Sequence, residues 1–250
     1  MAKTKVEFVC RECGASHHQW AGQCLDCKEW NTLEEIVISQ ATSSKPESLK
    51  DLPASKVQNL TEITALNKDR LSTGLTELDR TLGGGLVDGS VVLIGGDPGI
   101  GKSTLILQAL ATLNSNNTTL YVSGEESAEQ VSERAIRLGI KEDILFIGET
   151  HLEKIIKLSK DVKPKVIVID SIQTMVTDLS TSAPGSVTQV RDCAAQLTQY
   201  AKQTNTILLM IGHVTKGGAL AGPRILEHMV DAVLYFEGDA GGRYRIIRAV

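Results

Sequence analysis

Residues 96–103 have the composition and spacing of a loop that folds around phosphate groups. Their sequence, GDPGIGKS, matches the pattern G-x-x-x-x-G-K-[ST] at every fixed position. Glycines let the backbone turn its N–H groups toward an anion, and a following helix directs its positive end at the same place. A glycine turn without a ligand is the alternative, but the apolar strand before it and the helix after it favour a phosphate-binding loop.

The chemistry of such a loop assigns roles to its side chains. Lys102 would contact the β- and γ-phosphates of ATP, and Ser103 would bind Mg²⁺. Lys102 is therefore a candidate catalytic residue as well as a binding residue. We predict that the nucleotide is held by Gly96, Asp97, Pro98, Gly99, Ile100, Gly101, Lys102, Ser103 and Thr104.

Carboxylates that follow two apolar strands are candidates for chemistry at that phosphate. Asp170 ends the strand expected at 165–170 and would hold Mg²⁺ directly or through water. Glu125 follows the strand expected at 118–123 and would orient and polarise an attacking water, because open-sheet sites lie beyond the carboxyl ends of the strands. Glu126 is the alternative for this role. Structural interpretations stay open. Asp170 could be an ordinary acid at the end of a strand, and Glu125 and Glu126 could merely favour the N-terminal end of the next helix.

Four of the five cysteines fall within the first 27 residues as two Cys-x-x-Cys pairs. The pairs are Cys10 with Cys13 and Cys24 with Cys27. Four thiolates on two tight turns suit a tetrahedral metal, and their softness favours zinc over iron. Because four sulfurs leave no open coordination position, we predict structural zinc. Two disulfide bonds in a secreted protein are the alternative, which the lack of a signal-peptide pattern disfavours.

Other residues near the cysteine pairs have structural interpretations. His17 and His18 lie between the pairs and are interpreted as surface residues, although either could replace a ligand. Trp20 and Trp30 are expected to pack around the metal, because so small a module has little other core. Cys193 falls in a helical pattern and is expected to be a buried, small apolar residue.

Apolar runs alternate with helical patterns after residue 60 and place these motifs on a sheet. Strands are expected at 91–95, 118–123, 144–147, 165–170, 206–212, 230–237 and 244–250. Helices are expected at 102–113, 127–138, 150–161 and 186–202. The last three helices would be opened by Ser127 with Gln130, Thr150 with Glu153, and Ser186 with Gln189. Apolar strands that alternate with helices predict an α/β fold with a mostly parallel sheet covered on both faces.

Composition divides the chain into three parts. Residues 1–36 form a small four-cysteine zinc module, 37–59 a linker rich in Ser, Lys and Pro, and 60–250 a packed α/β domain. The chain carries a net charge of -4, so contact with nucleic acid requires a local basic patch. No stretch approaches the roughly 18 apolar residues that span a bilayer, and the N-terminus lacks a secretory apolar run. We therefore expect a cytoplasmic protein without membrane contact.

Several motifs occur together with the four-cysteine finger in this sequence. They are LSTGLTELD at 71–79, GGGL at 83–86, GGDPGIGKST at 95–104, YVSGEES at 121–127, VIVIDSIQT at 166–174 and GHVTKGGALAGPRILEHMVDAVLYFEGD at 212–239. This combination, which covers almost the whole chain, closely resembles the bacterial RadA (Sms) family of RecA-like ATPases. The resemblance implies a RecA-like P-loop core in a hexameric, ATP-driven, helicase-type motor. Such a motor acts on single-stranded and branched DNA in recombination and repair, including branch migration, with RecA or replication proteins as partners.

The same resemblance implies roles for particular residues. Residues 96–103 would bind ATP, Glu125 would be the catalytic carboxylate and Asp170 the acid on the magnesium side. His213 would sit where this family senses the state of the nucleotide, and a hydrogen-bonded histidine at a strand end is the alternative.

A DNA-contacting loop of the central channel is implied at 214–224. This glycine-rich segment carries a cation near each end, Lys216 and Arg224. Mobile positive groups repeated by each subunit suit binding to the backbone of a single strand. An unremarkable surface loop is the alternative, and 171–185 is a second candidate channel loop.

One departure from the family pattern concerns the end of the sequence. The family continues with a Lys-Asn-Arg-Phe-Gly run and a Lon-protease-like domain, whereas this sequence stops at Val250 inside an alternating strand pattern. We therefore expect a fragment of a longer protein. Since that run supplies cations to the nucleotide of the neighbouring subunit, we expect nucleotide and zinc binding with weak turnover.

Two other classes of function remain as hypotheses. One is a nucleotide-switched module with slow or no turnover that binds DNA or a protein, because the doubled acids Glu125 and Glu126 resemble those of slow clock ATPases in the same superfamily. The other is a small-molecule kinase, because zinc modules and P-loops also meet in thymidine kinases. In those enzymes the zinc site follows the P-loop, whereas here it comes first, and no acceptor-binding motif is apparent.

Overall fold

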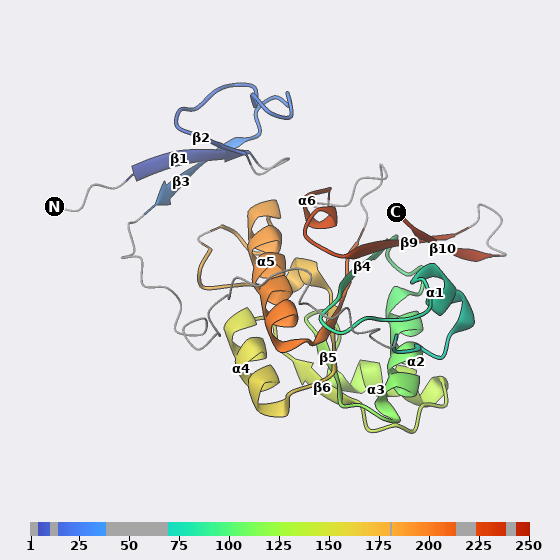
Figure 1. Cartoon of the computed structure of the whole chain (residues 1–250). Helices are drawn as coiled ribbons and strands as arrows, with labels where there is room; N and C mark the ends of the chain where they lie inside the picture. The colour runs from blue at the N-terminus through green and yellow to red at the C-terminus, as the bar shows by residue number, and fades with distance from the viewer. Residues whose placement is uncertain (1–4, 11–14, 39–69, 181, 214–223, 239–243) are drawn as a thin grey trace, which may run out of the picture.

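The structure is a computed structural model, shown in Figure 1. It describes residues 5–10, 15–38, 70–180, 182–213, 224–238 and 244–250. Nearly all of the linker expected at 37–59, and the boundary expected at residue 60, lie outside the described residues. Among the helices that are described, none is both long and apolar enough to cross a lipid bilayer.

The N-terminal part forms a three-stranded antiparallel sheet in the order β2-β1-β3. Its strands are β1 (Lys5–Cys10), β2 (Ser16–His17) and β3 (Leu33–Ile38). The last strand extends to Ile38, beyond the module boundary expected at residue 36. Among its described side chains, Cys10, Cys24 and Leu33 are buried, so two cysteine side chains occupy an interior that a larger domain would fill with aliphatic groups.

The larger sheet has seven strands in the order β10-β9-β4-β8-β7-β5-β6. Its strands are β4 (Val91–Gly96), β5 (Thr119–Ser123), β6 (Leu145–Gly148), β7 (Val166–Asp170), β8 (Ile207–Ile211), β9 (Ala232–Gly238) and β10 (Arg245–Ala249). All neighbouring strands are parallel except β10, which is antiparallel to β9. The mostly parallel α/β fold predicted from the sequence is confirmed.

Helices cover both faces of this sheet (Figure 1). They are α1 (Thr76–Thr81), α2 (Lys102–Asn114), α3 (Ala128–Arg137), α4 (Leu152–Val162), α5 (Val187–Thr204), the short α6 (Arg224–Glu227) and a 3-10 turn, η2 (Ile172–Thr174). Val91 and Leu93 of β4 join the core under α4 and α5, whereas Val92 and Ile94 join the core under α2 and α3. Because successive side chains of a strand point to opposite faces, a strand covered on both sides reads as an unbroken apolar run.

Two of the three expected helix caps are confirmed. Ser127 forms a complete capping box with Gln130 at the start of α3. The hydroxyl of Ser186 accepts the backbone N–H of Gln189 at the start of α5. Each cap satisfies an N–H group that the first turn of a helix leaves without a partner.

The cap expected from Thr150 and Glu153 at the start of α4 is wrong. The carboxylate of Glu149 accepts the backbone N–H groups of Thr150 at 2.9 Å and His151 at 3.0 Å. The hydrogen bond from the His151 backbone, followed by that from the ammonium of Lys154, holds the pKa of Glu149 at about 2. The carboxylate of Glu153 instead accepts the hydroxyl of Thr177, 24 residues away, at 2.5 Å. Glu153 therefore contacts a residue from a distant part of the chain instead of capping its own helix. The sequence pattern of the helix alone cannot predict such a contact.

The carboxyl ends of the parallel strands meet along one edge of the sheet. Ser123 at the end of β5 pairs with Asp170 at the end of β7, which pairs with Ile211 of β8. Gly124, directly after β5, donates its backbone N–H to the carbonyl of Asp170 at 2.9 Å. A Cβ on Gly124 would lie 2.1 Å from the hydroxyl oxygen of Thr174. Glycine is therefore required where the segments after β5 and β7 touch.

Replacing Gly124 with alanine is expected to lower the free energy of unfolding by about 1–3 kcal/mol, because overpacking forces neighbouring groups to shift. Gly148 is the matched control: it ends the neighbouring strand β6, and a Cβ there would make an ordinary contact 3.5 Å from the Phe146 ring. Urea unfolding followed by circular dichroism measures both variants. Equal losses of stability would show that the two segments do not touch as closely as described.

Candidate functional site

The glycine-rich loop joins β4 to α2 at the carboxyl edge of the sheet. Gly96 lies against β9, where a Cβ would approach the carbonyl oxygen of Phe236 to 2.4 Å. Gly99 has a φ of +77°, in the left-handed region that glycine adopts without strain. The helix α2 then begins at Lys102, and the N–H groups of its first turn have no acceptor within the helix. These features fit the phosphate chain of a nucleotide.

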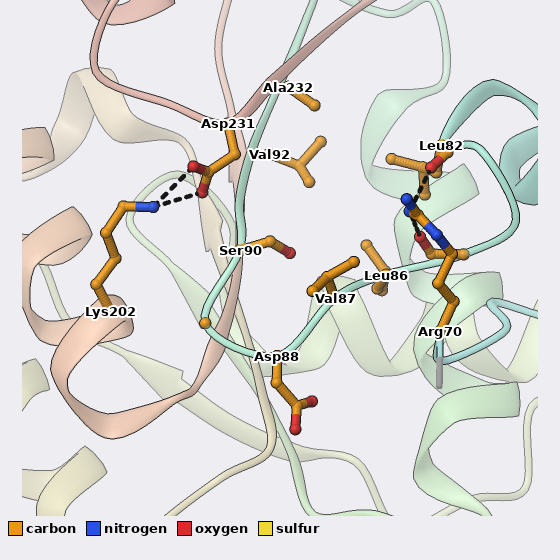
Figure 2. A pocket seen from close by; sticks show the side chains of 12 residues that line it. Arg70, Leu82, Leu86, Val87, Asp88, Ser90, Val92, Lys202, Asp231 and Ala232 are labelled. Atoms are coloured by element: carbon orange, nitrogen blue, oxygen red, sulfur yellow. Dashed lines mark hydrogen bonds and ion pairs between the residues drawn. The ribbon is translucent and has the colours of Figure 1, made fainter. Parts of the chain in front are cut away.

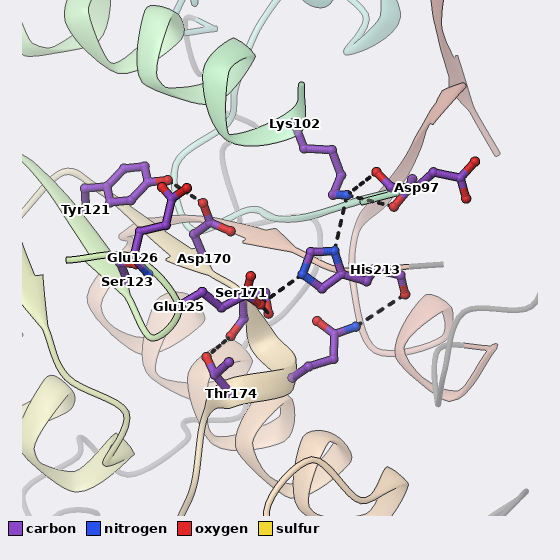
Figure 3. A network of polar contacts seen from close by, with 12 residues as sticks. Asp97, Lys102, Tyr121, Ser123, Glu125, Glu126, Asp170, Ser171, Thr174 and His213 are labelled. Carbon is purple, nitrogen blue, oxygen red and sulfur yellow. Dashed lines mark hydrogen bonds and ion pairs between the residues drawn. The ribbon is translucent and has the colours of Figure 1, made fainter. Parts of the chain in front are cut away.

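Lys102 lies inside this loop and is only 4% exposed. Its ammonium donates to the carbonyl oxygens of Gly96 at 2.7 Å and Asp97 at 2.9 Å, as Figure 3 shows. Burial lowers the pKa of Lys102, and the carboxylates of Asp170, Glu125 and Asp97 act in the opposite direction. The loop therefore holds a positive group at the place where phosphates would lie.

Asp170 is 4% exposed at the end of β7. Tyr121 of β5 donates its hydroxyl to Oδ2 of this carboxylate, and Ser103 of α2 also donates to it. Burial raises the pKa of Asp170, and the two hydrogen bonds oppose that effect. Burial and the neighbouring Asp170 raise the pKa of Tyr121, which therefore stays a donor. The two oxygen ligands predicted for Mg²⁺, on Ser103 and Asp170, are thus near enough to influence each other, which fits a shared cation.

Glu125 lies between the ends of β5, β7 and β8. Its Oε1 accepts the hydroxyl of Ser171, and it lies 2.9 Å from Nε2 of His213 (Figure 3). The other ring nitrogen of His213 lies 3.4 Å from the ammonium of Lys102. The hydrogen bond from His213, followed by that from Ser171, lowers the pKa of Glu125 against the effect of burial. A connected set of polar groups therefore runs from the loop to a carboxylate that is ionised at neutral pH.

Glu126 has a different environment from Glu125. Its carboxylate forms an ion pair with Arg134 of α3, and its backbone N–H donates to the hydroxyl of Ser123 at 2.9 Å. An acid committed to an arginine on the following helix is less able to hold a water molecule. The geometry therefore favours Glu125 over Glu126 for the role in polarising water.

Sequence reasoning missed Tyr121 and Ser171 as members of this set. Ser171 follows Asp170 directly, so its position after a strand was the available signal. Tyr121 is fully buried within an apolar strand, and nothing in its spacing separates it from an ordinary core aromatic residue. The remaining predicted residues, Pro98, Ile100, Gly101 and Thr104, lie along the loop and the first turn of α2.

The expected DNA-contacting loop falls mainly outside the described residues. Lys216 lies in the segment 214–223 that the structure does not describe, and of Arg224 only the backbone position at the start of α6 is described. The second candidate, 171–185, begins with residues packed into the core: Ser171, Ile172, Met175 and Thr177 are all buried. Only its later part, from Asp178 onward, is exposed enough to act as a loop.

The described cysteines of the N-terminal module converge on one point. The ligand atoms of Cys10, Cys24 and Cys27 lie within 4.8 Å of one another, and Cys13 lies outside the described residues. The sulfurs of Cys10 and Cys27 are 3.6 Å apart, far longer than a disulfide bond of about 2.05 Å. Two thiolates bound tetrahedrally to zinc at about 2.3 Å lie about 3.8 Å apart. The spacing fits zinc and disfavours a disulfide bond between these two residues.

Two interpretations of the module's other residues are wrong. Trp20 and Trp30 are 60% and 68% exposed, and do not pack around the cysteines, whose buried interior is completed by small side chains and Phe8. His17, expected at the surface, is half-buried, and its Nε2 lies 3.5 Å from both Cys24 Sγ and Asp26 Oδ2. The exposure of His18 and the burial of Cys193 are as predicted, and burial raises the pKa of the Cys193 thiol to about 12.

A pocket of about 430 Å³ lies at the amino end of β4, where the chain enters the strand. Figure 2 shows the side chains that line it. Its charged groups are satisfied within the protein: Lys202 pairs with Asp231 at 2.7 Å, and Arg70 donates to two backbone carbonyls. The buried hydroxyl of Ser90 has no hydrogen-bond partner among the described residues. One unsatisfied hydroxyl gives little basis for binding an anion, so this pocket is not the nucleotide site.

Removing metal from the module is expected to unfold it and leave the larger domain folded, because the buried interior of the module consists largely of the cysteines themselves. The only two tryptophans of the chain, Trp20 and Trp30, belong to the module, so tryptophan fluorescence reports on this part alone. A chelator should change that emission while the circular dichroism of the α/β domain persists. Unchanged emission after the metal is extracted would contradict a structural metal site.

Two family models match separate stretches of the chain. The family model described as "AAA domain" matches residues 57–219, and the model described as "Rubredoxin metal binding domain" matches residues 8–35.

The chain is also similar over its whole length to proteins named DNA repair protein RadA. It is 55% identical to that of Pseudomonas aeruginosa over 251 residues, and 48% identical to those of Escherichia coli and Bacillus subtilis over 256 and 254 residues. It spans 55% to 56% of the length of these relatives. The resemblance to bacterial RadA stated from the motifs is confirmed, and the chain belongs to the AAA domain family.

Proposed function

We propose that this chain is the ATP-hydrolysing motor of a protein that acts on single-stranded and branched DNA during recombination and repair. The observation that carries the proposal is the set of polar contacts from Lys102 through His213 to Glu125, beside the buried Asp170. Phosphoryl transfer requires positioning and charge stabilisation rather than covalent chemistry from the protein. A cation, an acidic metal ligand and an ionised carboxylate at one sheet edge meet that requirement.

The loop and two oxygen ligands would hold the substrate. Backbone N–H groups of residues 96–104 and the ammonium of Lys102 would bind the phosphates, and Lys102 would exchange its two loop carbonyls for phosphate oxygens. Ser103 and Asp170 would hold Mg²⁺, which neutralises charge on the phosphate oxygens when bound. Tyr121, by donating to Oδ2 of Asp170, would leave the other oxygen of that carboxylate for the cation.

Glu125 would position the attacking water. Ser171 and His213 both contact its Oε1, so Oε2 is the oxygen available to accept a hydrogen bond from water. The lowered pKa of Glu125 keeps this group ionised at neutral pH. An ionised acceptor in a fixed orientation raises the fraction of water molecules aimed at the phosphorus.

His213 would couple the nucleotide to DNA. It contacts both Lys102 and Glu125, and the segment 214–224 follows it directly in the chain. Departure of the γ-phosphate would change those contacts and so the order or position of that segment. Lys216 and Arg224 would contact the phosphates of DNA, which makes binding sensitive to salt.

The relatives support the wider part of the proposal. Their printed name is DNA repair protein RadA, which supports a role in DNA repair. We further propose that the protein works in the cytoplasm. A homo-hexameric ring would present segment 214–224 of each subunit to one strand in turn, with branch migration as the outcome and RecA or replication proteins as partners. Zinc would hold the N-terminal module folded.

A nucleotide-switched binding module is the second candidate. The lowered pKa of Glu125 favours it, because a more acidic carboxylate is a weaker general base. In that case ATP would fix a conformation or a ring, with slow or no turnover.

Glu125→Gln is expected to reduce ATP hydrolysis in the presence of single-stranded DNA by about 100-fold or more while nucleotide binding persists. Glu126→Gln is the matched control and should keep turnover within a few-fold, since its carboxylate is committed to Arg134. Lys102→Ala should lose both binding and hydrolysis. Phosphate release and nucleotide binding are measured side by side. Hydrolysis that survives Glu125→Gln would favour the nucleotide-switched module.

A further inference from the structure

The hairpin of β9 and β10 lies beside the nucleotide loop. Phe236 of β9 pairs with Gly96 at the end of β4, and Gly238 pairs with Arg245 of β10. A Cβ on Gly238 would lie 2.9 Å from the Cδ1 atom of Ile100. Because β10 runs antiparallel to β9, it begins at the carboxyl edge of the sheet. Its first residue, Arg245, is thereby placed at the loop.

The guanidinium of Arg245 lies over the start of α2. Its Nη1 atom is 3.0 Å from the position that a Cβ on Gly101 would occupy, and Gly101 is the N-cap residue of α2. Glycine at this position makes room for the guanidinium. Arg245 shares its strand face with Ile247, which packs against the core that contains α2, so the side of β10 that carries Arg245 is the side that faces this helix.

Arg245 differs from two other arginines of this domain. It is exposed, and within the described residues it has no hydrogen bond or ion pair. Arg248, on the opposite face of the same strand, pairs with Glu237. Arg134 pairs with Glu126. Arg245 is therefore a guanidinium beside the loop that is still available to an anion.

The charged groups around the loop favour a second cation there. The acids that raise the pKa of Lys102 are Asp170, Glu125 and Asp97, so three negative groups surround one ammonium. A nucleotide phosphate chain adds further negative charge. A planar guanidinium offers two parallel N–H groups to phosphate oxygens, so it is well suited to balance this excess negative charge.

We propose that Arg245 binds the phosphate chain of the nucleotide in the same subunit, so that the loop and the β9–β10 hairpin close on the ligand from two sides. This inference rests on the proposed function, since it needs a nucleotide at residues 96–104. The hairpin thereby becomes part of the binding site, and Gly101 is required as much for the approach of Arg245 as for the turn.

Calorimetry of the whole chain with ADP and with inorganic tripolyphosphate tests the proposal, because tripolyphosphate has a phosphate chain as long as that of ATP but no base. Arg245→Ala should raise the dissociation constants of both ligands by about 10- to 100-fold, which is the range for a lost hydrogen bond to a charged group. The affinity of Arg245→Lys should lie between those of the natural chain and the alanine variant, because lysine keeps the charge but lacks the two parallel N–H groups of the guanidinium. Arg248→Ala, the control on the same strand, should bind within two-fold of the natural chain.

The outcomes separate this inference from the proposed function. Tripolyphosphate binding that is unchanged in Arg245→Ala overturns the inference, even if ADP binding falls, because the contact would then be to the base. If Lys102→Ala binds both ligands as tightly as the natural chain does, the assignment of the nucleotide site is wrong. Thermal melting checks that each variant is folded. If Arg245→Ala melts at a lower temperature than the natural chain, the binding test is made with Arg245→Gln, which keeps the aliphatic part of the side chain.

Discussion

The contact between His213 and Glu125 joins the ends of two strands that are 88 residues apart in the chain. Through His213 the same set of contacts reaches Lys102 in the glycine-rich loop. Three segments that follow three different parallel strands are therefore linked by side chains at one sheet edge. A parallel sheet makes this possible, because its strands end level with one another and their following loops meet.

Burial makes these polar contacts obligatory. Lys102 and Asp170 are each 4% exposed, and an isolated charge at that depth would be strongly destabilising. Each has partners that stabilise its charged form: backbone carbonyls for Lys102, and the hydroxyls of Tyr121 and Ser103 for Asp170. The protein thus holds opposite charges close together without a direct ion pair, and the ammonium of Lys102 must release its loop carbonyls to bind a phosphate. Such a site has its polar groups oriented before the ligand arrives.

Most of the fold could be predicted from local patterns in the sequence. Apolar runs located the strands because helices cover both faces of the sheet, and the serine caps of α3 and α5 depended only on residues three positions apart. The errors involve partners that are distant in sequence. Glu153 accepts a hydrogen bond from Thr177 rather than capping its own helix, and Trp20 and Trp30 are exposed because the cysteines, Leu33, Phe8 and two alanines already fill the module. For the site, motif spacing indicated Lys102, Glu125 and Asp170, whereas Tyr121, Ser171 and Arg245 depend on how strands and loops are placed side by side.

The most direct test of the account is a crystal structure of this chain with Mg²⁺ and a non-hydrolysable ATP analogue. We predict phosphate groups against the backbone N–H groups of residues 99–104, with the ammonium of Lys102 about 3 Å from a phosphate oxygen and released from the carbonyls of Gly96 and Asp97. The opposite result is an ammonium that keeps both carbonyl contacts, with the analogue bound elsewhere on the protein or not at all. That result would contradict the assignment of this sheet edge as the nucleotide site.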